Sequence, residues 1–300
     1  LSLQDGTTVG GYSNCTAGNT SDALASPWGI AVDIGGSLFV SDYNNERVMR
    51  LQEGSTVGSI VVGTGIAGNG LTQLHNPTLV FVDASSNIYV SDNSNIRVML
   101  WRNGSSSGVV VAKTISRAIG LAVDSQENIY VSDPDYHWVT KWASNATNGT
   151  VMAGMGIAGS DNQHLYYPYG LYLDEVHSYL YIADLYNNRI QRYTLGISTS
   201  GTTVAGGNGQ GSGDNQLYYP QGVCVSKNTG DIYIADTYNH RIQKWRAGAT
   251  SGVTIAGTAG VYGCTATLLY GPASITLSLN ETFLYVGDLN NNRVQRFQLI

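Results

Sequence analysis

The chain has 300 residues, of which 42% are hydrophobic and 12% charged, and its formal net charge is -6 at pH 7. No apolar run approaches the roughly 20 residues that a membrane-spanning helix needs, so we expect no insertion into a bilayer. The 15 Lys and Arg residues fall mostly inside a repeated motif and leave no basic surface for phosphates, so we expect no nucleic-acid partner. The chain starts at Leu1 without the basic and apolar segments of a signal peptide, so we expect any leader to lie outside it.

A strand, turn and strand pattern repeats six times along the chain. Apolar residues alternate with period two on both sides of a polar turn, and the Asp that closes each first strand recurs after 50, 41, 51, 52 and 52 residues. A sheet-forming unit of this length without a helical period predicts a radial array of blades. In five copies an Arg follows five residues after the Asp. The pairs are Asp42 and Arg47, Asp92 and Arg97, Asp184 and Arg189, Asp236 and Arg241, and Asp288 and Arg293.

This pattern resembles the NHL repeat over essentially the whole chain. The resemblance implies an all-β fold, a six-bladed β-propeller of four-stranded antiparallel blades in a single domain, 1–300. The last repeat lacks a fourth strand, and residues 1–12 resemble the fourth strands near 201–206 and 252–257, so we expect the N-terminal strand to complete the C-terminal blade. The predicted blades are 27–62, 77–112, 118–153, 168–205, 220–256 and 272–300, with 1–12 as the closing strand of the sixth.

The paired Asp and Arg residues flank the turn, so we expect each carboxylate to accept turn amides and to pair with the guanidinium. This is a structural role. The alternative, a ring of six carboxylates for a metal or for acid–base chemistry, requires the turns to converge on the axis.

The linking loops show one irregular blade. Five inner strands follow a Leu-x-x-Pro motif, whose Leu is expected to fill the seam between blades and whose Pro suits the first residue of a strand. The third blade has Ala118 in place of that Pro, Trp138 in place of the Arg, and a loop about ten residues shorter.

Cysteines and sequons favour an extracellular location. Cys15 and Cys264 lie in equivalent loops on either side of one blade and are expected to form a disulfide, with Cys224 buried and free; three unpaired thiols are the alternative. N-linked glycans are expected because all six Asn-x-Ser/Thr sequons fall in predicted turns or loops. These are Asn14, Asn19, Asn103, Asn145, Asn148 and Asn280.

Two features bear on the kind of site. The inner strands begin with a mixed aromatic and polar set, for which we favour a plugged channel over a pocket for a small polar ligand: Trp28, Thr78, Ile119, Tyr169, Gln221 and Ala273. Exposed aromatic residues of blade three are expected to form a protein interface. They are Tyr136, His137, Trp138 and Trp142, joined by tyrosine pairs at 166–167 and 218–219, of which Tyr167 and Tyr219 are equally explained by blade packing.

The sequence therefore predicts a secreted, glycosylated propeller without enzymatic activity or cofactor, which acts as a protein-binding or structural module and self-associates in an extracellular assembly. The alternative is a metal-dependent enzyme of the amidating-lyase or lactone-hydrolase type with its site in the axial channel. The five histidines show no metal-ligand spacing, and the residues that begin the inner strands suit Ca²⁺ poorly.

Overall fold

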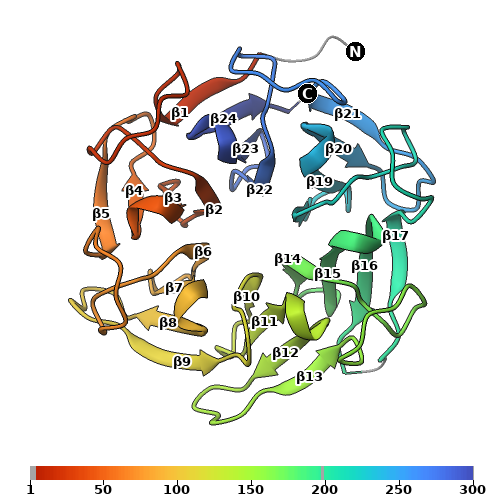
Figure 1. Ribbon diagram of the computed structural model, residues 1–300, viewed down its shortest axis with the longest axis horizontal. Coiled ribbons are helices and arrows are strands. Elements are labelled where there is room, and N and C mark those ends of the chain that lie inside the picture. The colour runs from red at the N-terminus through yellow and green to blue at the C-terminus, as the bar shows by residue number, and fades with distance from the viewer. Residues whose placement is uncertain (1–4, 197–198, 300) are drawn as a thin grey trace.

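Each strand, turn and strand unit forms the second and third strands of one sheet, and six four-stranded antiparallel sheets form a ring (Figure 1). The computed structural model describes residues 5–196 and 199–299; residues 1–4 of the predicted closing segment and Ile300 of the last blade lie outside them. The predicted six-bladed propeller is confirmed.

Blades are numbered in chain order and their strands run from the axis outward (Figure 1). Blade one holds β2 (Pro27–Val32), β3 (Leu38–Asp42), β4 (Arg47–Leu51) and β5 (Gly58–Gly63), and blade two holds β6 (Pro77–Val82), β7 (Ile88–Asp92), β8 (Arg97–Trp101) and β9 (Val109–Lys113). Blade three holds β10 (Leu121–Val123), β11 (Ile129–Asp133), β12 (Trp138–Trp142) and β13 (Thr150–Ala153), and blade four holds β14 (Pro168–Asp174), β15 (Tyr179–Asp184), β16 (Arg189–Thr194) and β17 (Thr202–Gly206). Blade five holds β18 (Gly222–Val225), β19 (Ile232–Asp236), β20 (Arg241–Trp245) and β21 (Val253–Gly257), and blade six holds β22 (Pro272–Leu277), β23 (Phe283–Asp288), β24 (Arg293–Gln298) and β1 (Thr7–Gly11).

The N-terminal strand closes the ring. Strand β1 pairs antiparallel with β24, so that Thr7 lies opposite Arg296 and Thr8 opposite Gln295. Both ends of the chain therefore belong to one sheet, and the ring opens only if this ladder of backbone hydrogen bonds breaks.

Apolar cores lie at the seams between blades. The buried residues form six clusters, each of which joins neighbouring blades. The Leu of the Leu-x-x-Pro motif is at most 2% exposed and belongs to a seam cluster in all five cases, as predicted. These residues are Leu24, Leu74, Leu165, Leu217 and Leu269. Full burial of each such side chain contributes about 1.5–3 kcal/mol.

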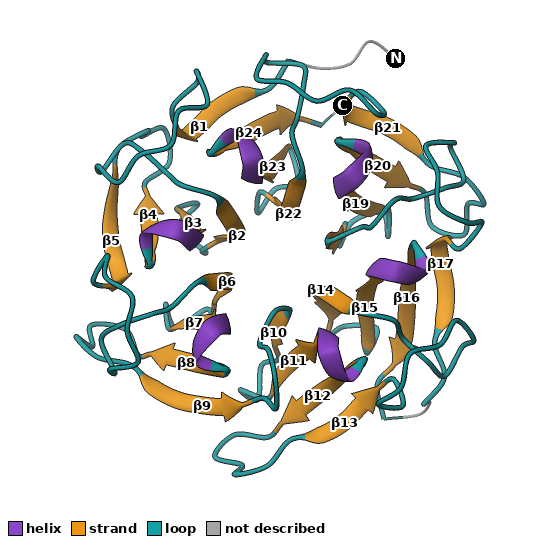
Figure 2. Ribbon diagram, viewed as in Figure 1, coloured by secondary structure: helices purple, strands orange, loops and turns teal. Residues whose placement is uncertain are grey.

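A three-residue 3-10 turn joins the second and third strands of every blade, and all six turns lie on one face of the ring (Figure 2). They are η1 (Tyr43–Asn45), η2 (Asn93–Asn95), η3 (Pro134–Tyr136), η4 (Leu185–Asn187), η5 (Thr237–Asn239) and η6 (Leu289–Asn291). We call this side the turn face. No helix in the described residues is long and apolar enough to cross a membrane.

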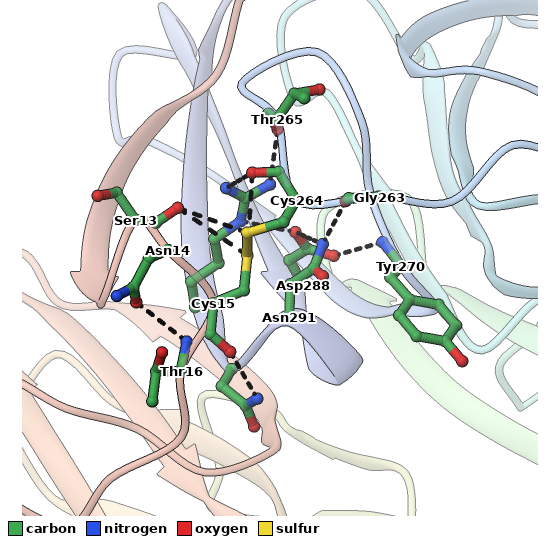
Figure 3. The surroundings of a disulfide bond; sticks show 12 residues. Ser13, Asn14, Cys15, Thr16, Gly263, Cys264, Thr265, Tyr270, Asp288 and Asn291 are labelled. Atoms are coloured by element: carbon green, nitrogen blue, oxygen red, sulfur yellow. Dashed lines mark hydrogen bonds and ion pairs between the residues drawn. A yellow bond between two sulfur atoms is a disulfide. The ribbon is translucent and has the colours of Figure 1, made fainter.

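The predicted disulfide is confirmed. Cys15 and Cys264 are bonded, their Cα atoms are 6.1 Å apart, and the bond joins two linking loops beside blade six (Figure 3). The main-chain oxygen of Cys264 also accepts a hydrogen bond from Arg293, so the bond is fixed to the blade that closes the ring. Cys224 is free and buried, as predicted, and burial raises the pKa of its thiol.

Candidate functional site

The Asp and Arg residues of each repeat form a buried clasp. The distance from Arg Nε to Asp Oδ2 is 2.6–2.9 Å in all five pairs, and each Asp is fully buried. The predicted amide donor from the turn is a side chain, the Asn described below, and in the described residues no main-chain N–H of the turn donates to the carboxylate. Its other oxygen accepts an N–H from the linking loop that precedes the blade; in blade five, Tyr218 donates to Asp236 over 2.7 Å.

Each clasp fixes a linking loop to its blade. In blade five the Arg241 guanidinium donates to the main-chain oxygens of Ser212, Gly213 and Gln216. A third member, an Asn three residues after the Asp, was missed although the sequence shows it in the same five copies. Its amide donates both to the Asp and to a loop carbonyl. These residues are Asn45, Asn95, Asn187, Asn239 and Asn291.

Blade three replaces both the Arg and the Asn. The Asp133 carboxylate accepts instead three N–H groups of the shortened loop, from Ile115, Ser116 and Arg117. Burial raises the pKa of Asp133, and these amides lower it in part. Burial likewise raises the pKa of the five clasp carboxyls, and their amide and guanidinium donors oppose that shift. The side chains bond within their own blade or to its linking loop, so they act in structure.

The residue after each 3-10 turn links neighbouring blades. It adopts a left-handed conformation, and in five blades its side chain accepts an N–H from the next linking loop. His137 accepts in this way from Tyr167, and His240 from Gly271, each over 3.2 Å. Burial lowers the pKa of His240, which favours the neutral imidazole that this bond needs. The linking residues are Glu46, His137, Asn188, His240 and Asn292.

Two aromatic rings meet across the axial channel on the turn face. Trp28 of blade one stacks across the axis on Tyr169 of blade four, with ring centroids 6.3 Å apart. Ile119, Thr78 and Ala273 are buried beside them. These two rings narrow the channel at this end, and burial raises the pKa of Tyr169 strongly.

The lining of the channel does not provide a metal site. The described residues contain no group of three or more His, Cys, Asp or Glu side chains placed to hold an ion. Most of the residues that line the channel are apolar, whereas Ca²⁺ requires six to eight oxygen ligands and Zn²⁺ is held by nitrogen, sulfur or carboxylate ligands.

The predicted interface residues of blade three divide into two groups. Tyr136 is 37% exposed and stacks on the half-buried Trp138 at 5.1 Å. The prediction that Trp142 is an exposed interface residue is wrong. Trp142 is 7% exposed and packs in the core cluster between blades two and three, and its Nε1 donates a hydrogen bond to Thr140. It contributes to packing and is not available to a partner.

Tyrosine rings continue from blade three across the turn face. Tyr186 contacts Tyr166 and Tyr167 at 4.9 Å, and it contacts Tyr219 of the next linking loop at 5.1 Å. Tyr238 then contacts Tyr219 at 5.0 Å. We call this continuous array the tyrosine arc. It comprises Tyr166, Tyr167, Tyr186, Tyr218, Tyr219 and Tyr238.

The arc is both exposed and rigid. Tyr186 is 39% exposed and Tyr238 is 51% exposed, while their neighbours Tyr167 and Tyr219 are half-buried. Ring pairs of this kind contribute about 0.5–1.5 kcal/mol each beyond burial. The prediction from sequence missed Tyr186 and Tyr238, although both occupy the second position after the clasp Asp in successive blades.

The Asn residues of the six sequons all lie outside strands. Every one of these Asn residues is exposed and lies in a turn or loop. A glycan at any of them therefore leaves the hydrogen-bond ladders intact.

A closed ring of six four-stranded blades defines the class of fold: the chain is a six-bladed β-propeller that contains an NHL repeat. Residues 217–245, which include the clasp of blade five, match the NHL repeat.

Relatives in sequence match only part of the chain. NHL repeat-containing protein 2 of Bos taurus is 33% identical over 97 residues, which cover 30% of this chain and 12% of that protein. Because the chain matches so little of this relative's length, nothing about its activity transfers directly.

Solved structures share the fold. An auxiliary nutrient binding protein of Bacteroides ovatus has a TM-score of 0.73 at 16% identity, over 99% of this chain and 76% of that chain. A gluconolactonase of Xanthomonas campestris has a TM-score of 0.67 at 13% identity, over 93% and 89%. One is named for binding and the other for catalysis, so the shared fold does not decide the function.

Proposed function

We propose that this propeller is a non-enzymatic binding module of the extracellular space and that it docks a protein partner, a second copy included, through the tyrosine arc. The observation that carries the proposal is the unbroken contact of six tyrosine rings over two neighbouring blades. Tyr is enriched at protein interfaces because it offers a large rigid contact area with a polar tip.

The surroundings of the arc support a protein partner. The hydroxyls of Tyr186, Tyr218 and Tyr238 have no hydrogen-bond partner within the described part of the chain, so they remain available to donors and acceptors of another molecule. The partly exposed pair beside Tyr167, Arg117 and Asp135, is already joined at 3.3 Å. A partner therefore contacts aromatic faces and hydroxyl groups, and few unpaired charged side chains lose their hydration when it binds.

Site-specific photo-crosslinking tests this docking. Benzoylphenylalanine replaces Tyr238, and the protein is irradiated either alone or in an extracellular extract of its source. A discrete crosslinked product is expected. The product has the mass of a dimer if the partner is a second copy. Val253 provides a matched control because it lies in the same blade and is likewise 51% exposed, but on the outer strand β21. No product at 238, or identical products at both positions, contradicts the proposal.

The same face should respond to substitution. Tyr186→Ser combined with Tyr238→Ser is expected to weaken association at least about 30-fold, since an interface tyrosine of this kind contributes 2 kcal/mol or more. Sedimentation velocity of the purified chain, or titration with the captured partner, measures the loss against Val253→Ser.

Secretion and glycosylation form the second half of the proposal. The disulfide fits an oxidising compartment, and all six sequons are accessible. When the chain is expressed behind a secretory leader in eukaryotic cells, peptide-N-glycosidase F is expected to lower its mass, and Asn280→Gln to remove one glycan. Asn208→Gln, outside any sequon, is the control. A secreted, folded chain whose mass the enzyme does not change would refute glycosylation.

A further inference from the structure

A chamber that opens at one end lies inside the ring, below the rings of Trp28 and Tyr169. Its volume is about 380 Å³, within the range of roughly 300–1,000 Å³ that small-molecule sites have. All six inner strands contribute an aliphatic side chain to its wall. These are Ile30, Leu79, Leu121, Leu171, Val223 and Ile275.

The two ends of the chamber differ. On the turn face Trp28 and Tyr169 stack across the axis and narrow the chamber. At the other end Ile34 and Leu279 line the opening, and they are 66% and 62% exposed. A ligand therefore enters from the face opposite the tyrosine arc, and this site is independent of the docking surface proposed above.

An unpartnered polar atom lies at the turn-face end of the chamber. Gln221 directly precedes β18 and lines the cavity. Its side-chain oxygen, Oε1, is buried without a hydrogen-bond partner among the described residues. A hydroxyl or N–H of a ligand can donate to this oxygen and supply the hydrogen bond that it lacks. A neutral hydrogen bond of this kind contributes about 0.5–1.5 kcal/mol.

Charge is confined to the mouth. Lys227 and Glu281 are the charged residues of the wall, and the Glu281 carboxylate already accepts bonds from Ser226, Asn228 and the main-chain N–H of Lys227. Moving a charged ligand past them into the aliphatic interior removes its hydration without providing a partner. We propose that the chamber binds a small, uncharged, mostly apolar molecule that carries one hydroxyl or N–H group.

The probe N-phenyl-1-naphthylamine has this chemistry: it is neutral, aromatic and carries one N–H. Its fluorescence in the presence of the intact protein is expected to rise and saturate at one molecule per chain. No saturable rise would overturn the proposal.

Two variants fill the chamber. Ala31 and Thr276 are half-buried wall residues, so Ala31→Phe and Thr276→Phe place a ring in the space of the ligand. Each is expected to weaken binding of the probe at least tenfold, and circular dichroism checks that each folds; if one does not, the other decides. Val176→Ser is the control for binding to exposed apolar surface, because Val176 is 85% exposed. Binding that survives in a folded filled variant, or that is lost in the control, overturns the site.

Gln221→Leu tests the polar contact. This change is expected to weaken binding of N-phenyl-1-naphthylamine by about two- to tenfold, the equivalent of one neutral hydrogen bond. Binding of 1-phenylnaphthalene, which lacks the N–H, is expected to stay unchanged. An equal loss for both probes overturns the assignment of Gln221. The Tyr186→Ser and Tyr238→Ser double variant is expected to bind both probes normally, which separates this site from the docking face.

Discussion

Replacing Arg241 with Met is expected to lower the free energy of unfolding by about 3–5 kcal/mol, the cost of removing one partner from a buried ion pair. Arg241 is 1% exposed and lies 2.8 Å from Asp236, which is fully buried. The substitution leaves this carboxylate without its cation, and it leaves three loop carbonyls, those of Ser212, Gly213 and Gln216, without their donors. The loop ahead of blade five then loses its attachment to the sheet.

An exposed Arg pair provides the matched control. Arg102 and Glu127 lie 2.5 Å apart, but their side chains are 52% and 37% exposed. Arg102→Met is expected to cost at most about 1 kcal/mol, since water solvates Glu127 when the pair is broken. Urea denaturation of the two variants measures the difference. A cost below about 1 kcal/mol for Arg241→Met would show that the clasp is dispensable.

Removing the disulfide should lower the free energy of unfolding about as much as Arg241→Met does, because the unfolded chain gains conformational freedom when the bond is absent. Cys15 and Cys264 are separated by 249 residues, so the bond constrains almost the whole unfolded chain. The loop-closure relation gives about 5 kcal/mol for a loop of this length, and native bridges usually contribute 2–5 kcal/mol. The double variant Cys15→Ser and Cys264→Ser is therefore expected to lose several kcal/mol of stability.

Differential scanning calorimetry measures this loss as a lower melting temperature, by roughly 2 °C per kcal/mol for a chain of this size. Dithiothreitol provides the control, because it should lower the melting temperature of the wild type to that of the variant and leave the variant unchanged. The native ring should persist in both, since the β1–β24 ladder also closes it. Equal melting temperatures with and without the disulfide would contradict the expectation.

The parts of the site that sequence predicted correctly depend on short, repeated spacing. The Asp and Arg five residues apart, the Leu-x-x-Pro motif and the missing fourth strand are visible because a copied unit shows them several times. Trp142 shows where this reasoning fails. It shares a face of β12 with Trp138, four residues earlier, but it lies at the other end of the strand, where the neighbouring blade covers that face. Packing against blade two buries it.

Sequence alone determined the number of blades, the closure of the ring and the disulfide, because each follows from which segments are copies of which. Only the tertiary structure decided which side chains meet. The carboxylate of Asp236 bonds a loop 18 residues earlier, Trp28 reaches Tyr169 across the axis, and the tyrosines of two blades form one surface. Contacts between distant residues depend on how the blades are placed around the axis, and a local pattern of residues carries no information about that placement.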